Sequence, residues 1–112
     1  MTKEFEIGIS LLKKVHKELE SLMQVQDRLN ARIIVNSIIN PITASAYQIR
    51  VGDGPHKEEL LEHLLKLVKE MRDLSDIKTM QENIGKVLEL LKEFEETPKM
   101  SPGKAKRTSV SV

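Results

Sequence analysis

The sequence predicts an all-α fold, an antiparallel helical bundle followed by a disordered basic tail. Apolar residues recur at helical spacing through most of the chain, and clusters of Pro, Gly and Asp divide it into segments of helix length. The clearest pattern is a heptad in the last third, where alternating steps of three and four residues keep one narrow apolar stripe on one side of a helix. Its members are Ile77, Met80, Ile84, Val87, Leu91 and Phe94.

Residues 3–38 are expected to form one long helix, about 50 Å in length at 1.5 Å per residue. Thr2 is the expected N-cap, and Glu4 and Glu6 in the first turn favour the positive end of the helix dipole. Gln26 interrupts the apolar track; we expect it at the edge of the stripe, and the alternative is a polar residue that specifies register. The track itself comprises Leu12, Val15, Leu19, Leu22, Leu29 and Ile33.

Asn40-Pro41 predicts a break, because proline lacks the backbone donor and clashes with the preceding turn. A short helix from Pro41 to about Val51 is expected after it. Two alternatives remain open: residues 47–51 alternate and suit a strand, or a single helix continues with a kink at Pro41.

Gly52-Asp53-Gly54-Pro55 is the strongest turn signal in the chain, with Gly54 or Asp53 as a cap and Pro55 near the first helical position. A helix over residues 55–74 is predicted to follow. Its apolar residues cover more than half of its circumference, so it must be covered on two sides. After a tight connection at 73–76, the heptad helix is expected to run over 76–96, and Thr97-Pro98 ends it. The last two helices form a helical hairpin.

Charge divides the chain into a helical domain, residues 1–96, and a tail, residues 97–112. The tail has four basic residues and no acid, which leaves 14 basic and 17 acidic residues, a net charge of −3, in the domain. Its Pro, Ser, Thr and Lys content is typical of disorder. Thr97, Ser101 and Ser109 have the form of phosphorylation sites, and the alternative is a purely solubilising tail. The basic residues of the tail are Lys99, Lys104, Lys106 and Arg107.

Composition excludes several kinds of site. The chain has no Cys, so it has no disulfide, thiolate nucleophile or Cys-based zinc site. No signal peptide and no membrane-length apolar run are visible, and we expect a soluble protein of the cytoplasm or nucleus with no membrane partner. His56, Glu59 and His63 share one helical face, but their spacing matches no metalloprotease or di-metal motif. We therefore expect a solvated face, with no cofactor and no metal.

A non-enzymatic helical oligomerisation or adaptor module is the expected function. The long first helix exceeds the later helices in length, so part of it needs a partner, either a second copy in a dimer or another helical protein. One alternative is a nucleic-acid-associated or virion-type protein that uses the basic tail with Lys13, Lys14, Lys17, Arg28 and Arg32. The second is a small helical enzyme or metal-binding bundle. The expected partner-helix interface comprises Leu12, Leu19, Leu22, Leu29, Ile33, Leu61, Leu65 and Val68.

Deletion of residues 97–112 is expected to leave the melting temperature of the domain nearly unchanged. The tail has too few apolar residues to offset an ordering entropy of about 1–2 kcal/mol per residue. Thermal unfolding followed by circular dichroism, with and without the tail, measures this. A fall of many degrees on deletion would mean that the tail is part of the folded domain.

Overall fold

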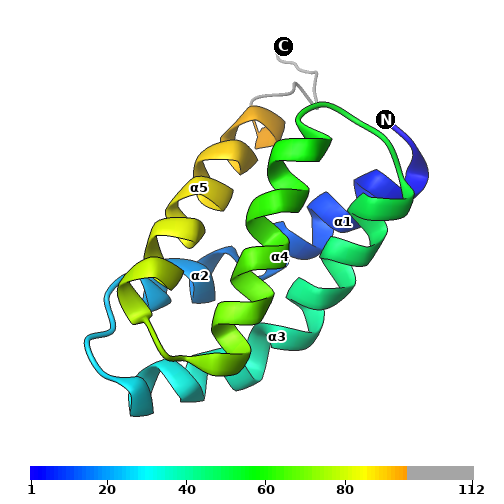
Figure 1. The fold of residues 1–112 in the computed structure, drawn as a ribbon. Coiled ribbons are helices and arrows are strands. Elements are labelled where there is room, and N and C mark those ends of the chain that lie inside the picture. Colours follow the sequence, from blue (N-terminus) through cyan, green and yellow to red (C-terminus); the bar gives the residue numbers. More distant parts are fainter. Residues whose placement is uncertain (96–112) are drawn as a thin grey trace.

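A computed structural model describes residues 1–95, and the expectations for the tail, including those for Thr97, Ser101 and Ser109, lie outside this range. The described residues form helices and contain no strand, which confirms the all-α bundle (Figure 1). The helices are α1 (Lys3–Lys14), α2 (His16–Leu22), α3 (Arg28–Val51), α4 (Lys57–Asp73) and α5 (Ile77–Glu95).

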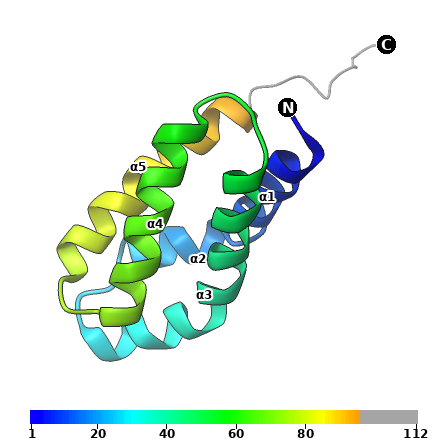
Figure 2. The ribbon, with the colours of Figure 1, turned by 45° about the vertical axis from the view of Figure 1, so that its right-hand side comes forward.

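α4 lies between α3 and α5 and packs against both (Figures 1 and 2). The predicted hairpin of the last two helices is confirmed as α4 and α5. α3 also packs along α1, and these two helices form the most extensive contact in the bundle. The short α2 contacts both α3 and α5. The consequence is that α3 stands at one edge of the bundle, flanked by α1 and α4.

The prediction of one long helix over residues 3–38 is wrong. The first break is at Val15, whose backbone N–H donates to the Leu12 carbonyl at 3.2 Å and whose φ of −102° departs from helical values. The second is the link between α2 and α3. There the Gln81 side chain, on α5, donates to the Leu22 and Val25 carbonyls at 2.9 and 3.0 Å. The Leu22 carbonyl also accepts from the Val25 N–H at 3.4 Å, so Gln81 adds to the hydrogen bonds at the end of α2 and binds the link that follows it.

The predicted break at Pro41 is also wrong, because Pro41 lies inside the continuous α3. Among the alternatives, the single helix that continues through Pro41 is correct, and α3 changes direction along its length in both views (Figures 1 and 2). Residues 47–51 are helical. Pro41 cannot donate to the carbonyl of Ser37, and Ser37 is an exposed residue. Ile38 and Ile42, on either side of the proline, are both buried in the same core, and this packing favours one uninterrupted helix over a break.

The predicted turn at Gly52–Pro55 is confirmed, and it is hydrogen-bonded to Thr2 near the N-terminus. The Thr2 hydroxyl caps α1 as predicted, accepting from the Phe5 N–H at 3.2 Å, and it also accepts from the Asp53 N–H at 2.8 Å. The start of α4 differs from the prediction, because its N-cap is His56 in the left-handed conformation (φ 62°). α4 is accordingly slightly shorter than expected, and α5 begins at Ile77, one residue later than expected.

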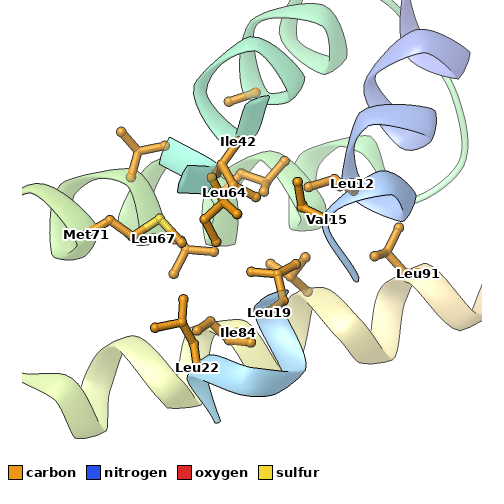
Figure 3. Packing of buried hydrophobic residues seen from close by; sticks show 14 of the residues in the cluster. Leu12, Val15, Leu19, Leu22, Ile42, Leu64, Leu67, Met71, Ile84 and Leu91 are labelled. Carbon is orange, nitrogen blue, oxygen red and sulfur yellow. The ribbon is translucent and has the colours of Figure 1, made fainter. Parts of the chain in front are cut away.

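The core collects the apolar stripes of all five helices. Leu12, Leu19 and Leu22 have no exposed surface and point into the same interior as Leu64 and Ile84 (Figure 3). Most of the heptad of α5 is likewise fully buried, so the seam predicted there packs within the chain.

At the crossing of α1 and α3 the two backbones come unusually close. Gly8 and Ser45 are both buried, and the Ser45 hydroxyl donates to the Gly8 carbonyl at 2.7 Å. A Cβ at position 8 would lie 2.6 Å from Cγ1 of the buried Ile49 and 3.1 Å from the Ser45 carbonyl oxygen. Gly85, in α5, differs: a Cβ there would have Met23 Cε as its nearest neighbour, at 3.8 Å.

These two glycines predict opposite effects of the same substitution. Gly8→Ala is expected to lower the free energy of unfolding by about 1–3 kcal/mol, because the methyl group overpacks the α1–α3 contact. Gly85→Ala is expected to raise it by about 0.5–1 kcal/mol through helix propensity alone. Urea unfolding followed by circular dichroism compares the two. Equal stability of Gly8→Ala and the unmodified chain would show that α1 and α3 are less tightly packed.

Candidate functional site

One exposed face of α3 carries large apolar side chains towards both ends of the helix, with two asparagines between them. Leu29, Ile33, Tyr47 and Val51 expose 75, 63, 61 and 52% of their surface. At 100° per residue these positions and the two asparagines between them fall within about 60° around the helix axis, opposite the buried residues of α3. We call this surface the α3 outer face; it comprises Leu29, Ile33, Asn36, Asn40, Tyr47 and Val51.

The α3 outer face carries no charge. The sequence has no charged residue between Arg32 and Arg50, and none of its 17 acidic residues lies in α3. Solvated helix faces are normally rich in charged side chains, as the outer surface of α5 is here. A row of large apolar side chains without interspersed charges is typical of a surface that another molecule covers.

A groove between α3 and α4 borders the outer face and has a volume of about 520 Å³. Tyr47 on α3 and Leu65 on α4, which is 51% exposed, line the groove from opposite helices. Among the described lining residues, three are basic and one is acidic. The apolar part of the groove is therefore bordered by a net positive charge. The full lining comprises Thr43, Ala46, Tyr47, Arg50, Leu65, Val68, Lys69, Arg72 and Asp73.

The basic border continues along α3. The Arg32 guanidinium reaches the C-terminal turn of α4, where Nη2 donates to the Arg72 carbonyl at 3.5 Å. Lys13 lies elsewhere, because its ammonium group donates to the Phe94 carbonyl at 3.5 Å near the end of α5. The basic positions considered for nucleic-acid contact, Lys13, Lys14, Lys17, Arg28 and Arg32, are therefore distributed over three helices.

The expected partner-helix residues separate into two groups in the structure. Leu12, Leu19, Leu22 and Val68 are buried in the chain's own core, so the prediction that they contact a partner is corrected. The first helix is also too short to extend beyond the bundle, which removes the length mismatch. Leu61 is half-buried against the core. The exposed group comprises Leu29, Ile33 and Leu65.

Tyr47 and Val51 were missed as surface residues by the sequence analysis. The signal for them was present, since both continue the spacing of Leu29 and Ile33 along one helix. It becomes visible only when the helix is extended through Pro41, and the break predicted there placed the two pairs on different helices.

The histidine face predicted as solvated is dispersed in the structure. His56 lies just before α4, and its ring meets the Phe94 ring edge-on with the two ring centres 6.4 Å apart. His63 lies on α4, and its Nδ1 is 3.2 Å from Asn83 Oδ1 on α5. Asn83, which is buried, donates in turn to Glu70 Oε1 at 2.8 Å, so His63 belongs to a polar contact that links α4 to α5. Within residues 1–95 no group of three or more His, Asp or Glu side chains is placed to hold a metal ion.

No protein-family model, curated protein or solved structure matches this chain. In the part of the chain that the structure describes, no helix combines the length and the apolar character needed to cross a bilayer.

Asp27 determines where α3, and with it the outer face, begins. Its carboxylate accepts from the Asn30 backbone N–H and from the Asn30 side-chain amide, both at 2.9 Å, and these bonds lower the pKa of Asp27 below its ordinary value of 3.8. Asp76 caps α5 in the same way: bonds from the Thr79 hydroxyl and then the Thr79 N–H lower its pKa. Both helices thus start at an ionised cap.

These caps predict an acid dependence of stability. Because the folded-state pKa is lowered, the contribution of each cap is fully present above pH 3.8 and is lost as the pH falls below 3.8 through the folded-state value. Asp27→Asn keeps a capping side chain that does not titrate, so its free energy of unfolding should fall less between about pH 5 and pH 2. Urea unfolding across this range measures it. Asp27→Ala is the control and should be destabilised near neutral pH as well; if Asp27→Asn and the unmodified chain lose equal stability in acid, the cap is not ionised.

Proposed function

We propose that this chain is a non-enzymatic helical interaction module, an oligomerisation or adaptor domain, which binds a partner helix along α3. The observation that supports it is the α3 outer face, an exposed apolar row on a helix of 24 residues without a charge between Arg32 and Arg50. Helix recognition uses apolar anchors one or two turns apart, and the outer face has two such pairs, Leu29 with Ile33 and Tyr47 with Val51, each spaced by four residues.

The energetics favour a covered surface. Burial of apolar area contributes about 25 cal/mol per Å², and four large side chains in one row offer this gain together. The row from Leu29 to Val51 is about 33 Å long when followed along the helix at 1.5 Å per residue, enough for a partner helix of several turns. Tyr47 in particular is of a residue type that is enriched at the energetic centres of interfaces. Asn36 and Asn40 supply hydrogen-bonding groups within the row.

Selection from a displayed library of helical peptides against the full chain tests the proposal. The expected result is enrichment of amphipathic helices, whose binding is then measured by fluorescence anisotropy. Ile33→Glu and Tyr47→Glu should each weaken binding about tenfold or more, because each places a charge among apolar side chains that the partner helix would bury. Both positions are exposed in the free chain, so the fold should tolerate the substitutions.

Ile7→Glu is the matched control. Ile7 is 42% exposed on α1, outside the α3 outer face, and the same change of side chain there should leave peptide binding unchanged. The proposal is wrong if no helical peptide is enriched, or if the enriched peptides bind the Ile33→Glu and Tyr47→Glu variants as tightly as the unmodified chain.

A further inference from the structure

We infer that the partner at this surface is an amphipathic helix with acidic residues beside its apolar stripe. The inference rests on the proposed function and names the chemistry of its partner. It comes from a second feature of the surface, the sign of the charges that line the groove between α3 and α4. The uncharged row is suited to an apolar stripe, and its border determines which charged helix can lie there.

The border of the surface is cationic. Arg50 on α3 and Lys69 and Arg72 on α4 line the groove, and among the described lining residues Asp73 is the acid that opposes them. Arg32 adds a fourth positive charge where it contacts the end of α4. A helix on the α3 outer face must place one flank over this border. Acidic side chains on that flank gain favourable pairing, while basic ones are repelled.

The groove gives such a helix an anchoring point. Tyr47 belongs both to the α3 outer face and to the groove, and Leu65 offers an apolar surface on α4. The volume of about 520 Å³ accommodates a large apolar side chain from the partner between these two residues. Carboxylates one turn before and after that anchor then come within reach of Arg50, Lys69 and Arg72.

A second copy of this chain is less suited to the surface. In an antiparallel pair of α3 outer faces about a two-fold axis, the same flank of both copies lies side by side, so Arg32 and Arg50 of one copy would approach the cationic flank of the other. In a parallel pair, α3 itself supplies no acidic residue to face that flank. The exposed surface of α5 mixes both signs, with Glu82, Glu89 and Glu93 among Lys78, Lys86 and Lys92, and offers no acidic stripe.

The tail and nucleic acid are disfavoured for related reasons. Residues 97–112 carry four positive charges and no acid, so the border repels them. Nucleic acid would be attracted to the border, but phosphates gain nothing from Leu29, Ile33 and Val51, which form most of the exposed row. An acidic amphipathic helix satisfies both the row and the border.

Two synthetic peptides of about 18 residues, five helical turns, test the inference against the full chain. They share one stripe of Leu and Phe and differ only in the flanking residues, which are Glu in one peptide and Lys in the other. Anisotropy titrations should show the Glu peptide binding about tenfold or more tightly than the Lys peptide. Added salt should reduce this preference, because the charges that produce it are exposed.

Reversal of the border charge localises the effect. The double variant Arg50→Glu with Lys69→Glu should weaken the Glu peptide about tenfold and strengthen the Lys peptide. Lys78→Glu with Lys86→Glu is the matched control. It changes the net charge equally but lies on the exposed face of α5, so it should leave the preference in place.

Four results would overturn the inference. The first two are equal binding of the two peptides and binding of neither peptide. The third is a dimer in sedimentation experiments that is dissociated by Tyr47→Glu. The fourth is binding of duplex DNA that is lost when the border charge is reversed. The helical-peptide library distinguishes an error in the acidic-partner inference from an error in the proposed function. If helices without acidic flanks are enriched and depend on Ile33 and Tyr47, the interaction module stands and only the acidic partner is wrong.

Discussion

The close crossing of α1 and α3 at Gly8 and Ser45 is the contact on which the arrangement of the bundle depends. The absence of a side chain at Gly8 lets the two backbones approach, and the Ser45 hydroxyl, buried there, satisfies its polar group by donating to the Gly8 carbonyl at 2.7 Å. Thr2 extends the same contact to the end of α3 by accepting from the Asp53 N–H. The N-terminal helix is therefore joined to α3 at two points along its length.

The packing of α1 against α3 determines which side of α3 is buried and which is exposed. With α1 on one flank and α4 on the other, the residues that face the bundle, such as Val35, Ile42 and Ile49, are completely buried. No described helix covers the opposite side, where Leu29, Ile33, Tyr47 and Val51 are exposed. The interaction surface is thus a consequence of how the bundle closes. The cationic border arises in the same way, because α4 places Lys69 and Arg72 beside Arg50.

Sequence patterns predicted the helices where the signals were local. The Thr2 cap, the turn at Gly52–Pro55 and the hairpin of α4 and α5 depend on neighbouring residues, and all three are confirmed. The predictions failed at Val15, at the α2–α3 link and at Pro41. At the link, Gln81 supplies the hydrogen bonds from a position far along the chain. At Pro41, burial of Ile38 and Ile42 on both sides outweighs the missing donor.

The candidate surface, too, was predicted only in part from local sequence patterns. Leu29, Ile33 and Leu65 were identified from helical spacing alone, but so were Leu12, Leu19 and Leu22, which the fold buries. An apolar stripe determines only that a helix face must be covered, and it does not say whether the cover belongs to the same chain. The sequence by itself therefore determined the helical class, the hairpin and the absence of charge between Arg32 and Arg50. Only the tertiary structure decided which stripes meet in the core and which one remains outside, because that choice depends on the close approach of distant segments.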